Sequence, residues 1–358
     1  MLRRYSSFIV PSQAQALTTS MGTIMFKKTT LALAVSGLLA ASAAQAATVY
    51  DQDGTDLEIY GRIAMGLEGG GVDNGVDNGE EFRNFGSRLR ITAGHQISSD
   101  LRAFARVEWR FTGDERNTSS GFDEVRNSYL GLESQQFGTF MAGNYNSFYD
   151  NYVMTPFDVY VERGYEFAGG GTQARGDSIG YKTPKMSGFQ AVISAKHFSE
   201  RGLTEAEQTS EGSVIATQGG VVYETGPARL ALGYVEDTVR GGGNGEVRYG
   251  ATGEFAVTDA FAARVGYETR GDDDVNGGGF DKIGVGATYA IDSWKFFADY
   301  YNIDVDGASD ERNAWALGSM YKLSSNFDMF LELNDRNLDA VNDFEEDMYY
   351  ALGARYHF

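Results

Sequence analysis

The chain has 358 residues, with 30 Lys and Arg against 50 Asp and Glu, and it has no cysteine. The lack of cysteine excludes disulfides and thiol chemistry. A formal charge of −20 makes nucleic acid a poor partner, because polyanions bind basic surfaces. The 46 Gly, 21 Tyr and 23 Phe beside only 4 Pro favour long strands.

The first 46 residues are basic and contain an apolar run from Leu31 to Ala44, followed by Gln45 and Ala46. This pattern predicts a secretory signal segment over 1–46, cleaved after Ala46. Met25 is the expected true start, because it directly precedes the basic residues and the apolar core. The run is shorter than the roughly 20 residues that a spanning helix needs. No longer apolar run follows, so a helical membrane protein is excluded.

Residues 47–358 then keep 26 of the 30 basic residues against 50 acidic ones, a formal charge near −24. Along this part, apolar and polar side chains alternate, so each strand has one face suited to lipid and one suited to water. The first strand shows the pattern in Leu57, Ile59 and Ile63 against Glu58 and Arg62. The mean hydropathy of −0.33 is compatible with such a pattern.

Arginines decide which face points inward. An Arg placed at the bilayer midplane of a barrel wall costs roughly 2–4 kcal/mol. Arg62, Arg88 in the second strand and three arginines of the third strand all lie on polar faces. These faces are therefore expected to line water, and the last strand, Asp347 to Phe358, repeats the alternation.

The number of such segments predicts an all-β fold, a sixteen-stranded antiparallel transmembrane β-barrel that forms one domain over 47–358. Short turns alternate with longer polar loops, as in outer-membrane barrels. The fourth strand, Asp123 to Ser134, fits less well. Its face opposite Arg126 carries Asn127 and Gly131, which are poor against lipid and indicate a subunit interface.

The stretch from Tyr145 to Gln173 is too long for a connector, and a loop of this length in a compact fold is usually functional. It carries Asp158 and Glu162 among many aromatic residues. We expect it to fold inward and to narrow a water-filled barrel.

The motifs resemble those of the general diffusion porins of Gram-negative outer membranes, over essentially all of 47–358. They are VYDQDGTDLEIYGR (Val49 to Arg62), GSRLR (Gly86 to Arg90), VRNSYLGL (Val125 to Leu132) and ALGARYHF (Ala351 to Phe358). The resemblance implies a homotrimer of barrels in the outer membrane, each narrowed by its third loop, with no cofactor and no enzymatic activity. It also implies contact with lipopolysaccharide, the barrel-assembly machinery, and small hydrophilic solutes and ions.

In that family, basic side chains of the wall face acidic ones of the loop across a constriction. The matching residues here are Arg62, Arg88, Arg126, Arg175, Asp158 and Glu162. The family's P-E-F-G-G signature is spread over Pro156 to Gly171 without a close match, and Asn144 stands where many relatives have a wall Arg. The final Tyr356 and Phe358 resemble the signal read by the assembly machinery.

Net charge predicts a preference for cations. The alternatives are a substrate-specific outer-membrane channel, which should show a continuous aromatic track in its lumen, and a non-conducting adhesin or structural barrel. Because the aromatic residues sit mainly on outward faces, the sequence favours general diffusion.

Three weaker patterns favour ordinary structural roles. Gly176 to Gly180 matches the G-x-S-x-G pattern of serine hydrolases, but it lacks the strand, turn and helix context of that motif. The histidines are too scattered for a metal cluster. Asp272 to Asp274 could hold a divalent cation with lipopolysaccharide, although a solvated acidic loop is the simpler interpretation.

Overall fold

The computed structural model describes residues 46–358 apart from 74–75, 78, 116–120, 168–174, 206–207, 209–210 and 339–346. The signal segment predicted for 1–46 therefore lies outside the described residues, except for Ala46. None of the helices in the described part of the chain has the length and apolar character that a membrane crossing requires.

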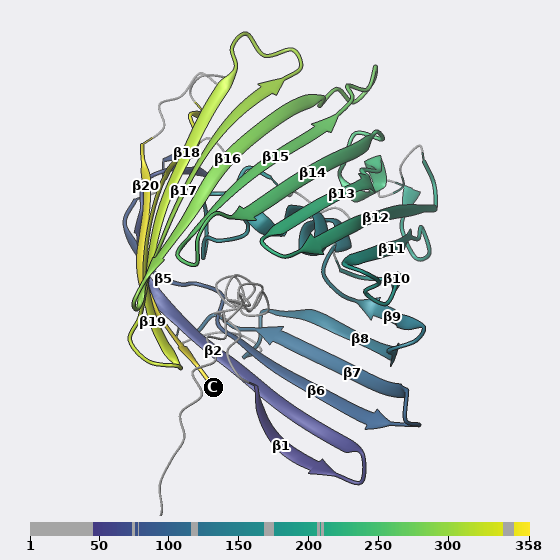
Figure 1. The fold of residues 1–358 in the computed structure, drawn as a ribbon. Coiled ribbons are helices and arrows are strands. Elements are labelled where there is room, and N and C mark those ends of the chain that lie inside the picture. Colours follow the sequence, from purple (N-terminus) through teal and green to yellow (C-terminus); the bar gives the residue numbers. More distant parts are fainter. Residues whose placement is uncertain are drawn as a thin grey trace, which may run out of the picture.

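Sixteen strands close into an antiparallel barrel, because β2 pairs with β6 on one side and with β20 on the other (Figure 1). The predicted fold class is confirmed. The barrel strands are β2 (Thr55–Gly69), β6 (Arg88–Gln96), β7 (Leu101–Arg110), β8 (Glu124–Ser134), β9 (Gly138–Asn144), β10 (Ser178–Lys182), β11 (Phe189–Phe198), β12 (Val214–Thr225), β13 (Ala228–Glu236), β14 (Val247–Ala256), β15 (Phe261–Arg270), β16 (Phe280–Ile291), β17 (Trp294–Val305), β18 (Arg312–Lys322), β19 (Phe327–Asp335) and β20 (Tyr349–His357).

Shorter elements complete the described chain. Strands β1 (Ala47–Gln52) and β5 (Glu81–Asn84) both pair with β2, and β3 (Val72–Asp73) forms a separate hairpin with β4 (Val76–Asp77). The helices are η1 (Tyr149–Met154, a π-helix), η2 (Thr155–Phe157, 3-10) and η5 (Val239–Gly241, 3-10). The first two belong to the segment between β9 and β10.

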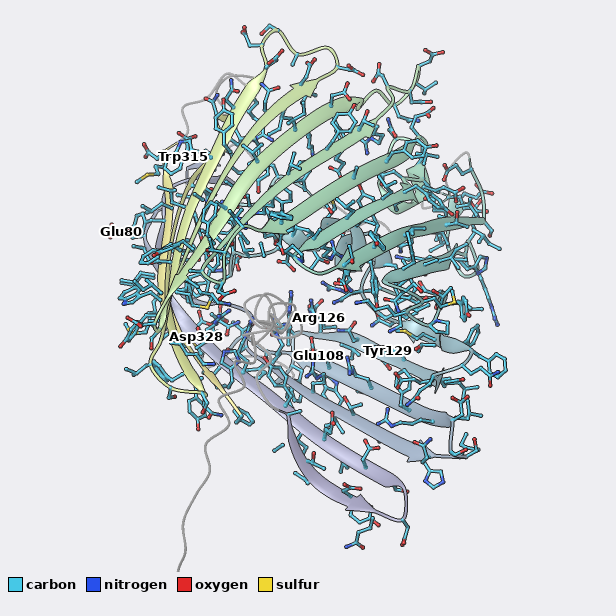
Figure 2. The ribbon with its side chains drawn as sticks, viewed as in Figure 1. Glu80, Glu108, Arg126, Tyr129, Trp315 and Asp328 are labelled. Atoms are coloured by element: carbon cyan, nitrogen blue, oxygen red, sulfur yellow. The ribbon has the colours of Figure 1, made fainter. Side chains whose placement is uncertain are left out.

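The alternation predicted for the last strand is present in β20. Leu352 and Tyr356 are each 49% exposed on the outer face, whereas Ala351 and Arg355 are buried on the inner face. Inward-facing polar residues recur on other strands, and Figure 2 shows Glu108 and Arg126 inside the sheet's curve. The barrel is therefore a two-sided wall whose inner face is polar.

The prediction for the fourth strand was wrong in register. The pairing of β8 with β7 shifts after Glu108, which lies opposite Asn127, while the next residue of β7 lies opposite Val125. Arg126 is the extra residue of a β-bulge, and such a residue reverses the faces beyond it. Asn127 is buried and Leu130 is 60% exposed on the outer face. The outer face of β8 is thus apolar, and the sequence argument for a subunit interface on this strand is lost.

Candidate functional site

The segment between β9 and β10 lies inside the barrel over its described residues 145–167, which we call the inward loop, and residues 175–177 lead into β10. Asn144 joins both ends of this segment to the wall. Its side-chain amide donates to the carbonyl of Val125 (3.0 Å), and its carbonyl oxygen accepts from the amide of Gly176 (3.0 Å). The amide of Arg175 also donates to the carbonyl of Tyr145 (2.9 Å). The segment therefore starts and ends at one point of the wall.

Glycines of the wall make room for helix η1 of the inward loop. Gly220, Gly233 and Gly250 lie opposite one another on β12, β13 and β14, and we call them the glycine row. A Cβ atom at Gly250 would lie 2.0 Å from the Cε of Met154 and 2.1 Å from the hydroxyl of Tyr149. Helix η1 can pack this closely because these three positions carry no side chain. The packing buries Tyr149 and Met154 almost completely.

Buried polar groups of the wall fix the rest of the loop. The Glu332 carboxylate accepts from the amides of Val161, Glu162 (3.1 Å) and Arg163 (3.4 Å). The side-chain carbonyl oxygen of Gln218 accepts from the hydroxyl of Ser147 (2.7 Å) and from the backbone amide of Tyr149 (2.9 Å). Since unpaired buried polar groups cost free energy, these bonds determine where the loop backbone lies.

Glu166 anchors the far end of the described loop. Its carboxylate forms ion pairs with Arg312 (2.5 Å) and Arg336 (2.9 Å). Burial acts against the charged form, but the hydrogen bonds from Arg312 and the charge of Arg336 hold the pKa of Glu166 below its ordinary value. Glu166 is therefore a structural anion and does not face the open part of the barrel.

A cavity of about 550 Å³ separates the inward loop from the opposite wall, and we call it the narrow section. Six arginines line it, which we call the basic wall: Arg62, Arg88, Arg110, Arg126, Arg175 and Arg355. Arg62 lies opposite Arg88, and Arg88 lies opposite Arg110, on neighbouring strands. Like charges in such positions repel.

Carboxylates behind the basic wall reduce this repulsion. Glu108 is buried and lies 2.7 Å from Arg126 and 3.6 Å from Arg88. Glu124 lies 3.1 Å from Arg175 and 3.2 Å from Arg110. Arg62 instead donates to two backbone carbonyls, those of Phe85 (3.0 Å) and Gly86 (2.9 Å). The arginines are thus held in place while part of their charge still faces the cavity.

On the loop side, Asp158 lines the narrow section and is exposed within it. Enclosure by the barrel raises the pKa of Asp158, against the opposing influence of Arg126 and Arg88. Glu162 does not line this cavity; its carboxylate lies 2.9 Å from Arg83 of β5. Burial raises the pKa of Glu162 as well, and Arg83 opposes that shift.

The structure thus brings five of the six predicted constriction residues together and places Glu162 beside them. Asp150 is the second loop carboxylate in the lining, with Arg110 and Arg355 as further cations. Sequence reasoning did not select these three. The sequence did contain a signal for them, because Arg110 and Arg355 lie on the polar faces of β7 and β20 and Asp150 lies in the inward loop.

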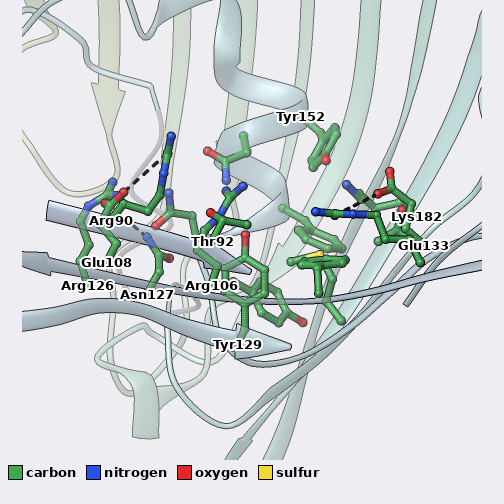
Figure 3. Close-up of a pocket in the computed structure, with 18 residues that line it drawn as sticks. Arg90, Thr92, Arg106, Glu108, Arg126, Asn127, Tyr129, Glu133, Tyr152 and Lys182 are labelled. Carbon is green, nitrogen blue, oxygen red and sulfur yellow. Dashed lines mark hydrogen bonds and ion pairs between the residues drawn. The ribbon is translucent and has the colours of Figure 1, made fainter. Parts of the chain in front are cut away.

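A second cavity, of about 350 Å³, lies between the inward loop and strands β6–β10 (Figure 3). It lies toward the short turns, because Arg102 near the start of β7 and Glu133 near the end of β8 are part of its lining. Its lining combines aromatic rings, such as Tyr129 and Tyr152, with cations such as Arg106 and Lys182. The sequence placed aromatic residues mainly on outward faces. Tyr129 turns inward because of the bulge in β8, and Tyr152 because it belongs to the inward loop.

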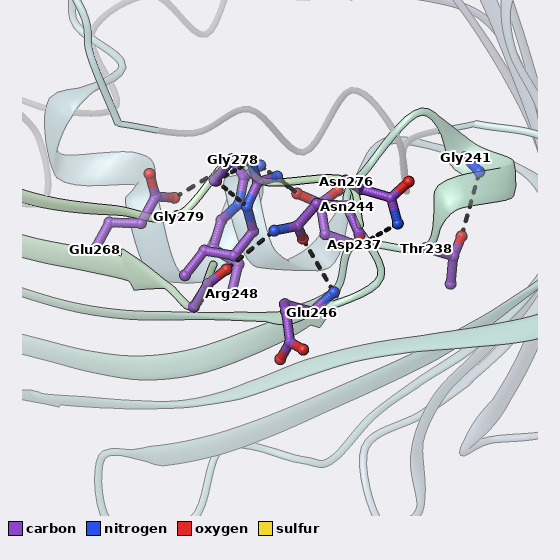
Figure 4. A network of polar contacts seen from close by, with 12 residues as sticks. Asp237, Thr238, Gly241, Asn244, Glu246, Arg248, Glu268, Asn276, Gly278 and Gly279 are labelled. Atoms are coloured by element: carbon purple, nitrogen blue, oxygen red, sulfur yellow. Dashed lines mark hydrogen bonds and ion pairs between the residues drawn. The ribbon is translucent and has the colours of Figure 1, made fainter. Parts of the chain in front are cut away.

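A network of polar contacts joins long loops to one another at the end of the barrel away from the short turns (Figure 4). Asp237 lies 2.6 Å from Arg248 and also pairs with Arg270. The side-chain amide of Asn244 donates to the carbonyls of Gly271 (3.0 Å) and Gly277 (2.7 Å). The loops after β13 and β15 are therefore fixed to each other, which keeps this part of the barrel mouth in one shape.

The weaker motifs have structural roles. Ser178 begins β10, and its hydroxyl donates to the carbonyl of Gly176 (2.5 Å), so the G-x-S-x-G segment continues as a strand. Asp273 accepts from the amides of Val275 and Asn276 within its own turn. The described residues contain no group of three or more potential metal ligands.

The chain end completes the closure of the barrel. Phe358 exchanges two backbone hydrogen bonds with Gly61 (2.7 and 2.9 Å), and its ring lies where a Cβ atom of Gly61 would be. The rings of Tyr356 and Phe358 are stacked at 6.4 Å on the outer face. Both rings are accessible, as an assembly signal requires; that role stays a prediction.

Comparisons with known proteins agree on one family. A family model described as Gram-negative porin matches residues 29–341. A monosaccharide porin of Halomonas is 32% identical over 304 residues, covering 78% of this chain and 81% of the relative. The outer membrane porin PhoE of Escherichia coli K12 is 25% identical, and the match covers 93% of this chain and 100% of the relative.

Solved structures show the same fold. An anion-selective porin from Comamonas acidovorans superposes with a TM-score of 0.68 at 18% identity, covering 85% of this chain and all of that one. The OmpF of Salmonella typhi, in complex with daunomycin, superposes with a TM-score of 0.65 at 16% identity, and the match covers 87% of this chain and all of that one.

Proposed function

From the premise that this chain belongs to the family of Gram-negative porins, which are channels and not enzymes, we propose that it lets ions and small hydrophilic solutes diffuse passively through the outer membrane. The observation that carries the proposal is the narrow section, where the basic wall faces Asp150 and Asp158 across a cavity of about 550 Å³. Passage there needs no binding step, because width and lining charge select the solute.

Opposed charges on the two sides of the narrow section create a field across the path. Low-dielectric walls strengthen such a field and orient dipolar solutes and water. Passage of a polar solute therefore costs less free energy than passage of an apolar one of equal size, because the polar solute interacts with the field in place of the water that it displaces. Arg62, Arg88, Arg126 and Arg175 are proposed as the positive side and Asp158 as the main negative side. Glu162 contributes less to the negative side, because its ion pair with Arg83 offsets its charge.

The ionic preference depends on which part of the channel dominates. Net charge predicted a preference for cations. The narrow section supports the opposite sign, since six arginines but two loop carboxylates are among the described residues that line it. Because selection is strongest where the path is narrowest, we expect a weak preference for anions. Reversal potentials in a salt gradient decide between the two signs.

A liposome-swelling assay with neutral sugars of increasing size tests the channel itself. A smooth fall of rate with solute size supports general diffusion, and no swelling with any sugar contradicts a channel. A substrate-specific channel is the second candidate, favoured by the inward-facing rings of the second cavity and by the relative named a monosaccharide porin. One sugar entering far faster than others of its size would support it.

Assembly and partners follow from the family. We expect a homotrimer, and one structural relative, OmpT of Vibrio cholerae, is described in a trimer form. Cross-linking that yields only monomers would contradict this expectation. Lipopolysaccharide near Asp272 to Asp274 and the assembly machinery at Tyr356 and Phe358 complete the proposed partners. Export through a cleaved signal over 1–46 is the proposed route.

A further inference from the structure

The second cavity combines features that plain diffusion does not need. It lies between the inward loop and strands β6–β10 (Figure 3). The positions of the two linings along the strands put it on the short-turn side of the narrow section. A volume of about 350 Å³ suits a small organic molecule. A solute that has passed the narrow section toward the short turns meets this cavity next.

Aromatic rings form a continuous series along the cavity. Phe104 and Tyr129 are 6.1 Å apart edge to face, and Tyr129 and Tyr145 are 5.8 Å apart. Phe148 continues the series from Tyr145 (5.3 Å) to Tyr152 (5.5 Å). Phe104, Tyr129 and Tyr152 are only partly buried, so part of each ring is accessible from the cavity. Such rings favour contact with another ring.

Two cations accompany the rings without a carboxylate partner among the described residues. The Nε of Arg106 donates to the hydroxyl of Thr92 (3.2 Å), and its guanidinium lies 5.8 Å from the ring centre of Tyr129. The ammonium of Lys182 lies 5.9 Å from the ring centre of Tyr152. The remaining guanidinium nitrogens of Arg106 have no partner in the described chain, and a guanidinium can bind a carboxylate through two nitrogens.

The carboxylates of the cavity are already engaged. Glu108 lies 2.7 Å from Arg126 and 3.7 Å from Arg90, and Glu133 lies 3.9 Å from Arg102. Arg102 also lies 2.7 Å from Asp56. Five cations and two carboxylates line the cavity among the described residues, so its local charge is positive although the chain as a whole is acidic.

We propose that this cavity is a binding site for small carboxylates that carry a ring, with Arg106 and Lys182 attracting the carboxylate and the rings beside them, those of Tyr129 and Tyr152, contacting the ring of the solute. The inference rests on the proposed channel function and adds a substrate class to it. A neutral sugar would leave both cations unused, and a small inorganic anion would leave the rings unused. Transient binding next to the narrow section raises the local concentration of such solutes and favours their passage.

Single-channel recording in planar bilayers tests the site, with benzoate as the probe. Acetate, which lacks the ring, and benzyl alcohol, which lacks the charge, are the matched probes. Benzoate is expected to reduce the chloride current at several-fold lower concentration than either. R106Q and K182Q should each raise the half-blocking concentration of benzoate about tenfold, because each removes a charged hydrogen-bond donor. Y129L should bring benzoate close to acetate.

Lys196 offers a matched control, since its ammonium also lies over a ring, that of Phe198 (4.6 Å), but it does not line this cavity. K196Q should leave the benzoate block unchanged. The inference would be overturned if benzoate and acetate blocked equally, or if K196Q weakened the benzoate block as much as R106Q and K182Q do. If R106Q does not assemble, K182Q gives the same test. A wild-type protein that conducts without benzoate block contradicts only this inference, whereas one that does not conduct contradicts the proposed function.

Discussion

The two sides of the barrel interior differ in what they do for the inward loop. The side formed by β12–β14 offers glycines and takes the buried side chains of Tyr149 and Met154 into close contact. The side formed by β2 and β6–β8 offers arginines and leaves a gap, which is the cavity of the narrow section. The first side determines where the loop lies, and the second determines what the gap attracts. The position of the inward loop and the charge that lines the gap can therefore be changed separately.

The largest effect is expected from filling the glycine row. G250A places a Cβ atom 2.0 Å from Met154 and 2.1 Å from Tyr149, which pushes the loop toward the basic wall. Overpacking of this kind costs about 1–3 kcal/mol of the free energy of unfolding. Thermal unfolding should show that loss, and planar-bilayer recordings should show a smaller conductance. G253A is the control on the same strand, where the nearest atom is 3.3 Å away. Equal effects of both variants would contradict the role of the row.

Loosening the loop backbone should have the next largest effect. E332Q replaces the carboxylate that accepts hydrogen bonds from the amides of Val161, Glu162 and Arg163 with a neutral amide. Hydrogen bonds to a charged group contribute roughly 1.5–3 kcal/mol, so this part of the loop should move more. The expected result is a noisier open-channel current at unchanged ion selectivity. E311Q, on an exposed carboxylate that accepts from the side-chain amide of Asn302 (2.8 Å) and does not contact the inward loop, serves as control. If the open-channel current of E332Q is as quiet as that of the wild type, the prediction is wrong.

Changing the charged side should alter selectivity without moving the loop. R88Q combined with R126Q removes two positive charges from the narrow section. At a few ångströms in water each charge is worth about 1 kcal/mol, or about 2 kcal/mol for both, and salt screens part of it, so the cation to anion permeability ratio should rise by up to about thirtyfold. Reversal potentials measure it. R240Q, in the loop after β13 and away from this lining, should leave the ratio unchanged, and an unchanged ratio in the double variant would remove both residues from the selecting position.

Acidification should give the smallest effect. Because the pKa of Asp158 is raised, this carboxyl becomes neutral at a pH above the ordinary range of an aspartate. Losing the negative charge leaves the basic wall less balanced, so anion preference should increase as the pH falls from 7 toward 4. Reversal potentials across that range test the sign. D158N should already show the low-pH preference at neutral pH and a weaker change on acidification, whereas an identical pH profile would assign the titration to other groups.

Much of the site could be predicted from the sequence because the pattern and the chemistry point the same way. Alternation of apolar and polar residues required Arg62 and Arg88 to face water, and the structure places both at the narrow section. The partner of Glu162 could not be predicted, because Arg83 lies on the short strand β5 far away in sequence. The glycine row was equally hidden, since each glycine acquires its meaning only from the helix opposite.

Period and polarity, which are local properties, determined the strands, their inner and outer faces and the existence of a long inward segment. Tertiary structure decided the rest. A single extra residue, Arg126, reversed the faces of β8, and pairing across the barrel selected which carboxylates of the loop meet the basic wall. The reason is that a strand's faces follow from neighbouring residues, whereas a contact across the barrel depends on the register of every strand between its two partners.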